Sequence, residues 1–407
     1  MENVVITSAA RTAVGTFMGS LKTEKPQDLA AHVIKEVVKR SQIEDKADQI
    51  NEVILGHVQA NPECSNIGRA AALQAGLPLT VPGYTIDRQC AASLQAVVSG
   101  TQQIQTGYGD IVVAGGVETM SRILFYLPPS SRFEPFRLGN VTLIDGFVRG
   151  AQTSAPEWKE YAGINMGMTA ERIAERYNIS REEQDEYAVH SHQKAIAAIK
   201  AGKFADEIVP YEVKNKKGSV MFATDEHARE TSVEQMAKLK PAFKRDGGSV
   251  TAGNASGMND AASAVVLMSE TKCKQLGLKP MARIVAHAAT GLDPWVMCLG
   301  PVSAVQSVLK RTGLKLDEID LFEFNEAFAA QSLGVLRELN MMPGTSLYER
   351  LNVNGGGIAL GHPLGATGTR LINTLVHELQ RRGGRYGIAS LCIGGGQGMA
   401  VLVEAIK

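Results

Sequence analysis

A glycine-rich stretch near the C-terminus carries one histidine that could do chemistry. Residues 352–371 read NVNGGGIALGHPLGATGTRL, with His362 near the middle. Backbone this rich in glycine forms either a flexible linker or a tight turn that lies close to a ligand. Leu351 and Val353 are typical of a strand end, and a helical pattern follows from residue 371. The flanks therefore favour a tight turn that holds His362 between a strand and a helix.

Cys90 is the first candidate for a partner of this imidazole. It follows a short strand predicted at 84–86 and opens a helix predicted over 91–104. A helix N-terminus stabilises a thiolate, and a nearby imidazole can take the thiol proton, which together give an activated nucleophile. Taken alone, such a cysteine is more often an inert buried thiol. If Cys90 lies opposite His362, the activated nucleophile is the favoured interpretation of this cysteine.

Two further polar positions follow predicted strands in the second half. Cys392 ends a strand predicted at 388–393, and the N–H groups of Gly394 and its neighbours could form an oxyanion hole. The alternative is a buried cysteine beside a structural turn. Asn325 and Glu326 come directly after the apolar run IDLFEF and are poor core residues. Asn325 serves either a site or the N-cap of a helix.

The elements that must position these residues occur in the same order twice. Strand, helix, strand, helix and strand alternate in each half, which predicts a duplicated α/β unit with two packed sheets. Asp28 is placed to N-cap the first helix. Corresponding turns of a duplicated unit meet near its pseudo-twofold axis, which brings Cys90 to His362. The matched segments are 4–15 with 283–291, 29–40 with 302–312, 50–56 with 319–324, 67–75 with 329–340, and 111–116 with 388–393.

The bulk composition excludes several classes of function. Lys+Arg and Asp+Glu each count 42 in 407 residues, so net charge gives no argument for nucleic acid or an anionic membrane as partner. The five cysteines are widely spaced and form no CxxC pair, which excludes a disulfide framework and predicts no metal site. No leader or apolar span is recognisable. These features predict a soluble cytoplasmic protein.

The alternation breaks between residues 119 and 249, which is typical of an insertion in the first half. A turn and strand at 251–268 (TAGNASGMNDAASAVVLM) then complete that half. We therefore predict an N-terminal half of 1–118 plus 250–275, an inserted domain of 119–249, and a C-terminal half of 276–407.

Several motifs together resemble the thiolases over essentially the whole chain. The stretches NVNGGGIALGHPLGATG at 352–368 and CIGGGQG at 392–398 are highly specific. The others are CxxS at Cys90, NEAF at 325–328, GGVETMS at 115–121 and TAGNASGMND at 251–260. The resemblance implies two half-domains in a layered αβαβα fold, with the insertion as a loop domain that binds coenzyme A.

The resemblance also implies a role for each candidate residue. Cys90 would take the acyl group from an acyl-CoA, and His362 would activate it and help bind the thioester oxygen. Cys392 would be the general acid/base that removes the α-proton of acetyl-CoA. Asn325 would hold a water in one oxyanion hole, and the N–H groups of Cys90 and Gly394 would form the other.

Seven further residues match positions that contact the substrate in this family. Each also has an ordinary interpretation as a surface arginine, a core apolar residue or a turn serine. By resemblance, Arg229 and Phe243 lie near the nucleotide and pantetheine, Ser256 binds a pantetheine amide, and Met166, Met297, Ala327 and Phe328 line the acyl pocket.

The chain departs from the family pattern beside the nucleophile. The stretch DRQCAAS has Asp87 where asparagine is usual, and Ala91, Ala92 and Ser93 where the family has x-Ser-Gly. Two more departures are Asn165, where synthetic thiolases often have histidine, and Cys298, where glycine is usual. If Cys298 lines the pocket, its side chain narrows the pocket or adds a third thiol to it.

We therefore expect an acetyl-CoA C-acetyltransferase without a cofactor, with coenzyme A thioesters as substrates. The alternatives are a degradative 3-ketoacyl-CoA thiolase for longer chains and a non-catalytic acyl-CoA-binding scaffold. A ketoacyl-synthase type of condensing enzyme would have histidine or asparagine in place of Cys392 and is set aside. The resemblance further implies a homotetramer, a dimer of dimers.

Overall fold

A ten-stranded sheet runs through the computed structural model, which describes residues 2–60, 62–134, 138–148, 160–161, 164–215 and 218–406. The strand order is β12-β13-β14-β11-β1-β10-β5-β3-β4, with the short β2 (Gly15–Thr16) paired to β10. The strands of the first half are β1 (Val4–Arg11), β3 (Glu52–Gly56), β4 (Gly83–Ile86), β5 (Ile111–Thr119) and β10 (Asn259–Ser269). Those of the second half are β11 (Ala282–Gly291), β12 (Leu321–Phe324), β13 (Tyr386–Ile393) and β14 (Gln397–Ala405).

The strand pairing confirms the predicted duplication. In the first half β4, β3 and β5 run parallel, and β10 and β1 continue antiparallel. In the second half β12 is parallel to β13, and β14 and β11 continue antiparallel. A single parallel bridge between Phe322 and Leu351 takes the place of β4. The two sheets that we predicted are joined by the antiparallel pairing of Val4–Ile6 with 282–284, which makes one continuous sheet.

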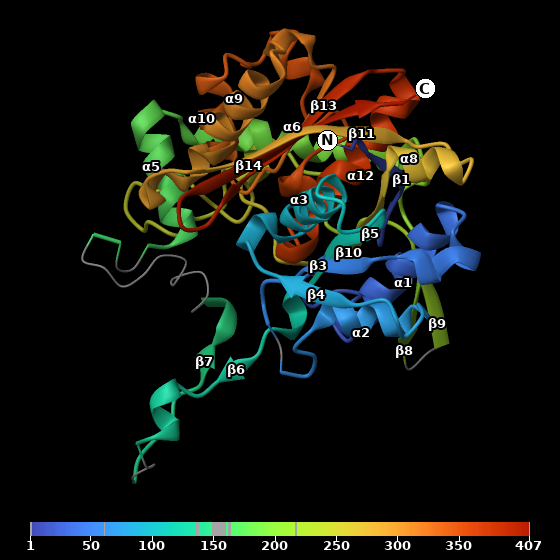
Figure 1. The fold of residues 1–407 in the computed structure, drawn as a ribbon. Helices are drawn as coiled ribbons and strands as arrows, with labels where there is room; N and C mark the ends of the chain where they lie inside the picture. The colour runs from blue at the N-terminus through green and yellow to red at the C-terminus, as the bar shows by residue number, and fades with distance from the viewer. Residues whose placement is uncertain are drawn as a thin grey trace.

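Helices form three layers around this sheet (Figure 1). The outer layer of the first half contains α1 (Pro26–Arg40) and α2 (Ile67–Gln74), and that of the second half α9 (Gly300–Thr312) and α10 (Ala329–Glu338). Between the two halves lie α3 (Ala92–Gln105) and α12 (Leu364–Arg382), which also pack on each other. The short helix α8 (Glu270–Gln275) follows β10.

Alternating side chains of the strands explain this layering. In β5, Val112 and Ala114 belong to the central core around α3 and α12, whereas Ile111 and Val113 pack under α1 and α2. Because successive strand residues point to opposite faces, a strand with helices on both sides must be apolar throughout. The runs that we predicted as buried strands have this composition.

Most predicted helices are confirmed within a few residues, but the predicted N-cap at Asp28 is wrong, and of the two alternatives for Asn325 the N-cap is excluded. The helix α1 begins at Pro26 after Lys25, without a side-chain cap, so Asp28 lies in its first turn instead of at its N-cap. Proline is favoured there because its φ is already helical and its missing N–H costs nothing. The N-cap of α10 is Phe328, so Asn325 does not cap that helix.

The described part of the inserted segment contains helices, short strands and an extended arm. Its elements are β6 (Phe125–Tyr126), β7 (Ile144–Asp145), α5 (Met166–Tyr177), α6 (Arg181–Lys200), β8 (Tyr211–Asn215), β9 (Gly218–Phe222) and α7 (Val233–Met236). The strands β6 and β7 pair with each other and extend away from the body as an arm, residues 122–134 and 138–148 (Figure 1). Within the described residues no helix is long and apolar enough to cross a membrane, and no group of acidic, histidine or cysteine side chains is placed to hold a metal ion.

Candidate active site

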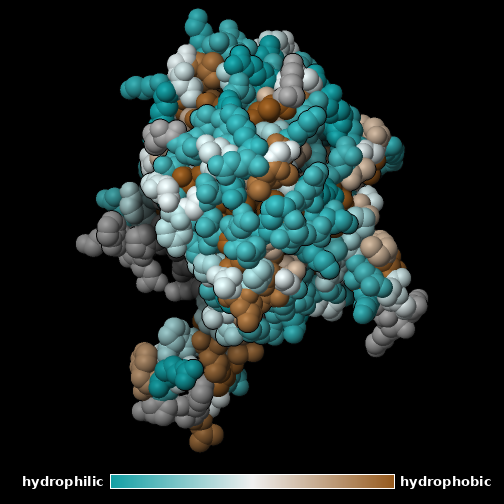
Figure 2. Space-filling view, turned by 45° about the vertical axis from the view of Figure 1, so that its right-hand side comes forward, coloured by the Kyte–Doolittle hydropathy of each residue, from teal (hydrophilic) through white to brown (hydrophobic). Residues whose placement is uncertain are grey.

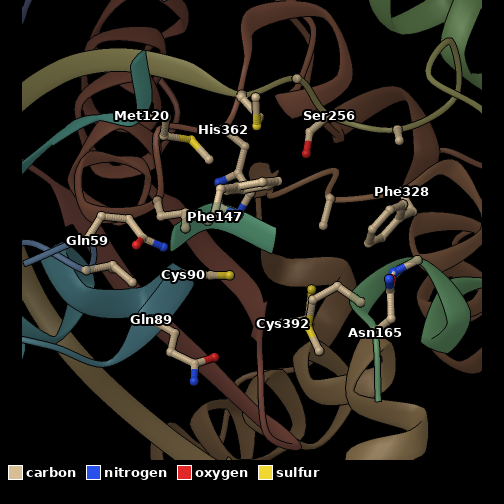
Figure 3. Close-up of a pocket in the computed structure, with 18 of the residues that line it drawn as sticks. Gln59, Gln89, Cys90, Met120, Phe147, Asn165, Ser256, Phe328, His362 and Cys392 are labelled. Carbon is tan, nitrogen blue, oxygen red and sulfur yellow. Dashed lines mark hydrogen bonds between the residues drawn. The ribbon is translucent and has the colours of Figure 1, made fainter. Parts of the chain in front are cut away.

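A cavity of about 500 Å³ lies where the two halves and the inserted segment meet. Figure 3 shows the side chains of Cys90, Cys392 and His362 pointing into this common space. Cys90 comes from the first half of the chain, and His362 and Cys392 come from the second, so the predicted meeting of Cys90 with His362 is observed. The other described lining residues are Val58, Gln59, Asp87, Gln89, Met120, Phe147, Val148, Asn165, Met166, Gly167, Phe243, Ala255, Ser256, Gly257, Met258, Met297, Ala327, Phe328 and Leu364.

Cys90 sits in a 3-10 turn that connects β4 to α3. The turn covers Gln89–Ala91 and runs into α3 at Ala92. The backbone N–H of Gln89 donates to Oδ1 of Asp87 at 2.6 Å, and Gln89 adopts a left-handed φ of 47°. A non-glycine residue in this region is uncommon, and such strain concentrates at functional sites. The turn therefore presents the sulfur of Cys90 at the start of a helix.

His362 lies between α11 (Gly357–Leu360) and α12, and its position requires a glycine before it. Gly361 has a φ of 101°, and a Cβ there would lie 2.4 Å from the side chain of Asn259. That side chain accepts the backbone N–H of His362 through Oδ1 at 2.9 Å and donates to Gly15 O at 3.0 Å. The imidazole is thereby fixed to β10 and the segment around β2.

The hydrogen bonds of His362 fix its tautomer. Nδ1 lies 2.7 Å from Oγ1 of Thr367, whose hydroxyl hydrogen goes to Pro363 O at 2.8 Å. The hydroxyl can then only accept from the ring, so Nδ1 carries the hydrogen and Nε2 has a free lone pair. Nε2 is buried and has no hydrogen-bond partner in the described part of the chain. This nitrogen is suited to receive a proton inside the cavity.

Cys392 and Gly394 lie at the end of the hairpin formed by β13 and β14. Ile393 pairs with Gln397, so Gly394–Gly396 form the connecting turn, with left-handed φ at Gly395 and Gly396. A hydrogen bond from the backbone of Gly394 to Cys90 lowers the pKa of that thiol. The turn therefore places a backbone donor beside the sulfur of Cys90, as an oxyanion hole requires.

Burial keeps both thiols and the imidazole neutral in the resting protein. Burial raises the pKa of Cys90 to about 11. The negative charge of Asp87 raises this pKa further, whereas the hydrogen bond from Gly394 lowers it. Burial and the Arg370 charge lower the pKa of His362 to about 3. Burial also raises the pKa of Cys392 well above its ordinary value, and the neighbouring thiols Cys298 and Cys90 add to this. A thiolate–imidazolium pair is thus disfavoured before substrate binds.

Asn325 is buried directly after β12, with both polar atoms of its amide lacking a protein partner among the described residues. Unpaired buried amides are costly and rare. Its neighbour Glu326 accepts hydrogen bonds from Ser191 on α6 at 2.6 Å, Asn352 at 2.8 Å and the N–H of Ile358 at 3.2 Å. Glu326 therefore joins this strand end to the inserted segment and to the turn before His362.

Six of the seven residues matched to substrate contacts line the cavity. The segment of Ser256 is fixed to the segment of Ala327 and Phe328. The N–H of Ser256 donates to Ala327 O at 2.9 Å, and Ala255 forms an antiparallel β-bridge with Phe328. The six are Met166, Phe243, Ser256, Met297, Ala327 and Phe328. Arg229 instead lies in a separate surface pocket with His192 and Lys200.

The departures beside the nucleophile have different places in the structure. Asp87 lines the cavity, whereas Ala91 and Ala92 are buried in the core. Ser93 is also buried and accepts the N–H of Thr369 on α12 at 3.0 Å, so it joins the two central helices. Cys298 is fully buried and is not among the described lining residues; its sulfur lies 3.4 Å from Oγ1 of Thr169. Asn165 lines the cavity and N-caps α5.

The sequence reasoning missed several lining residues. Phe147 and Val148 come from the base of the arm, and Gln59 from the loop after β3. Gln59 could have been found, because a polar side chain just after a buried strand is a candidate site position. Phe147 and Val148 carried no such signal, since they belong to the irregular inserted segment.

A thiol at the start of a helix, an imidazole with a free lone pair and a second thiol in one cavity are the groups that acyl transfer through a covalent thioester needs. Comparison with known proteins gives the class. The chain matches the model of the thiolase N-terminal domain over residues 4–271 and that of the thiolase C-terminal domain over residues 278–405. The chain therefore belongs to the thiolase family and is an acyltransferase of that family.

Individual relatives are similar over their full length. The chain is 48% identical over 403 residues to the acetyl-CoA acetyltransferase of Syntrophomonas wolfei, covering 99% of both. It is 45% identical over 405 residues to the beta-ketothiolase BktB of Cupriavidus necator, again covering 99% of both. The crystal structure of the Bacillus anthracis acetyl-CoA acetyltransferase matches with a TM-score of 0.93 at 47% identity, covering 100% of this chain and 99% of that one. Human mitochondrial 3-ketoacyl-CoA thiolase matches with a TM-score of 0.93 at 40% identity and the same coverage.

Proposed function

We propose that this thiolase joins two acetyl-CoA molecules into acetoacetyl-CoA and free coenzyme A, or runs the reverse thiolysis. The observation that carries the proposal is the meeting of Cys90, His362 and Cys392 in one cavity. The curated relatives named acetyl-CoA acetyltransferase support acetyl-CoA as the substrate.

In the first half-reaction Cys90 receives the acetyl group. Its sulfur attacks the thioester carbonyl while its proton passes to Nε2 of His362. Because both groups are neutral at rest, the proton moves together with the attack and not before it. The new N–H of His362 then faces the developing oxyanion, and coenzyme A leaves with that proton. Asn325 supports this step by holding a water with its unpaired amide.

In the second half-reaction Cys392 acts as the base. Its thiol first loses its proton to solvent, and the thiolate then removes an α-proton from a second acetyl-CoA. The resulting carbanion attacks the acetyl carbon on Cys90. The sulfur of Cys90 leaves and takes that α-proton from Cys392, which returns to its thiolate. The N–H groups of Cys90 and Gly394 stabilise the oxyanion in this step. Met166, Met297 and Phe328 provide the apolar wall for the acyl group.

Mass spectrometry after incubation with acetyl-CoA tests the covalent step. The expected result is one acetyl adduct on Cys90, which is absent in Cys90→Ala. Lack of the adduct in the wild-type protein would favour a non-catalytic acyl-CoA binder. Thiolysis of 3-ketoacyl-CoAs of four and more carbons then tests the chain length: a flat profile would favour the degradative alternative.

We further infer a homotetramer, in which the arm contacts other copies of the chain. The arm carries large apolar side chains on its surface, among them Phe125 at 64% exposure and Phe133 at 74%. Figure 2 shows apolar surface along this projection. Monomeric soluble proteins rarely expose contiguous apolar patches larger than about a few hundred Å², so exposed aromatic side chains gathered on one projection favour a contact with other copies.

A further inference from the structure

Glu118 is a buried carboxylate near the site that the proposed chemistry does not use. It is the last but one residue of β5, in the stretch GGVETMS, and it is 0% exposed. Its oxygens accept the backbone N–H groups of Val58 at 3.1 Å, Gln59 at 3.3 Å and Gly365 at 3.0 Å. The side chain of His57 approaches it as well, with Nδ1 3.1 Å from Oε1. Hydrogen bonds from three backbone N–H groups fix the position of this buried carboxylate.

These donors belong to separate walls of the cavity. Val58 and Gln59 follow β3 and line the cavity themselves. Gly365 lies in the first turn of α12, three positions after His362. The carboxylate thus also faces the N-terminus of a 19-residue helix, where a negative charge is favoured.

The packing between Gly365 and β5 leaves no room for a side chain at Gly365 or Gly116. A Cβ on Gly365 would lie 2.4 Å from Val117 O, and one on Gly116 would lie 2.0 Å from Gly365 O. The turn after His362 therefore rests directly on the backbone of β5. At this contact the carboxylate of Glu118 is the group that holds the turn by a hydrogen bond.

His57 extends the connection to the nucleophile. Its Nδ1 lies 2.9 Å from Val117 O and 3.1 Å from the Glu118 carboxylate, both of which are acceptors, so Nδ1 carries the hydrogen. Its backbone N–H donates to Ile86 O at 3.1 Å, at the end of β4. That carbonyl directly precedes the turn that holds Cys90. The next residue, Val58, donates its N–H to Glu118, so the backbone of residues 57 and 58 joins the segment of His362 to the segment of Cys90.

We propose that Glu118 is a positioning residue for acyl transfer, and that His57 anchors it. It keeps the turn of His362 in register with the turn of Cys90. Glu118 touches no reacting atom, since it is not among the described residues that line the cavity. The inference rests on the function proposed above, in which the imidazole takes the proton of Cys90. A displacement of about 1 Å between such groups can cost about 100-fold in rate.

Glu118→Gln tests this role with little change in volume. The amide has one fewer acceptor oxygen and presents an N–H₂ group to the donors that the carboxylate satisfied. We expect kcat for condensation, and the single-turnover rate of Cys90 acetylation, to fall about 100-fold. KM for acetyl-CoA should stay within about twofold, because the walls that bind coenzyme A are unchanged.

Glu378→Gln is the matched control. Glu378 is a buried carboxylate on α12, the helix that contains Gly365, and it lies about 20 Å along the helix from that residue. It accepts a hydrogen bond from Asn354 at 3.0 Å. This variant should lose thermal stability and keep its kcat. If Glu118→Gln likewise loses stability but keeps the wild-type acetylation rate, Glu118 is a purely structural carboxylate and the inference is wrong.

A pair of variants at His57 gives a decision even if Glu118→Gln does not fold. His57→Ala removes the side-chain donor, and His57→Gln restores an N–H that can reach the carboxylate. The expected order of acetylation rates is wild type, then His57→Gln, then His57→Ala. Equal rates in all three would overturn the inference. Absence of the Cys90 adduct in the wild-type protein would instead refute the proposed function itself.

Discussion

At the scale of single residues, the raised pKa of Cys392 should make condensation depend on pH if Cys392 is the base, as we propose. Removal of an α-proton needs the thiolate, and burial keeps this group as a thiol at neutral pH. A pKa above the usual ~8.5 means that the thiolate fraction still grows tenfold per pH unit through neutral pH and beyond. We therefore expect kcat for condensation to rise steadily from pH 7 to pH 9.

Stopped-flow measurement of condensation across this range checks the expectation, with acetylation of Cys90 in Cys392→Ala as the control. That half-reaction does not use Cys392, so the variant should acetylate Cys90 while its condensation is abolished. A condensation rate that is flat with pH would show that Cys392 is not the base that limits the rate.

A second prediction concerns Thr367, which fixes the tautomer of His362. Thr367→Val keeps the shape of the side chain but removes the hydroxyl that accepts from Nδ1. The ring is then free to place its hydrogen on Nε2, where it blocks proton transfer from Cys90. We expect kcat to fall by at least tenfold, in line with the effect of a general base. Thr367→Ser retains the hydroxyl and should recover most of the rate, whereas equal rates in both variants would argue against the tautomer assignment.

The motif residues predicted which thiols and which imidazole meet in the cavity, but they did not predict all of the side chains that surround these groups. Cys90 follows a strand, His362 follows a glycine turn and Cys392 lies at the end of a strand, and these positions meet because the chain is duplicated. The environment of Cys298 could not be read from its neighbours, since Met297 beside it lines the cavity while Cys298 faces Thr169. Which of two adjacent residues points inward in a short 3-10 turn depends on tertiary packing.

At the scale of elements, the close packing of α12 on β5 makes Gly365 sensitive to substitution. In Gly365→Ala the new methyl group would lie 2.4 Å from Val117 O, so the start of α12 must shift and carry His362 with it. We expect a large loss of kcat together with lower thermal stability, the latter by about 1–3 kcal/mol as for overpacking.

Gly383→Ala at the other end of α12 provides the comparison. Gly383 has a φ of 66° but nothing within 4 Å of an added Cβ. Its substitution should cost about 1 kcal/mol of stability and leave kcat unchanged. Parallel thermal melts and rate measurements on the two variants separate a general helix defect from a displaced imidazole. Loss of activity in both would refute the local explanation.

Periodicity alone predicted most helices and strands, but it did not predict which strands pair through their backbone hydrogen bonds. The apolar runs at β5 and β13 are unmistakable because both faces of each strand are covered. The joining of the two predicted sheets through β1 and β11 was not foreseen, because hydrogen bonds between edge strands leave no mark on side-chain patterns. The inserted segment shows the same limit, since the pairing of β6 with β7 involves only four residues.

At the scale of the whole molecule, the exposed apolar arm predicts how copies assemble. Leu124 is 41% exposed, Phe125 64%, Phe133 74% and Leu143 60%, so most of the arm's apolar surface remains open in one chain. Burial of such surface contributes about 25 cal/mol per Å². A charge at its centre would have to be desolvated in any interface. Phe125→Asp with Phe133→Asp should therefore split the proposed homotetramer into smaller assemblies.

Sedimentation velocity or light scattering measures this change, with Tyr108→Asp as the control. Tyr108 is a large aromatic side chain of comparable exposure, 65%, that lies outside the arm between α3 and β5. The control should keep the wild-type mass. Because Phe147 and Val148 at the base of the arm line the cavity, the double variant should also raise KM for acetyl-CoA as the base loses its support. An unchanged mass in the double variant would show that the arm is not what holds the copies together.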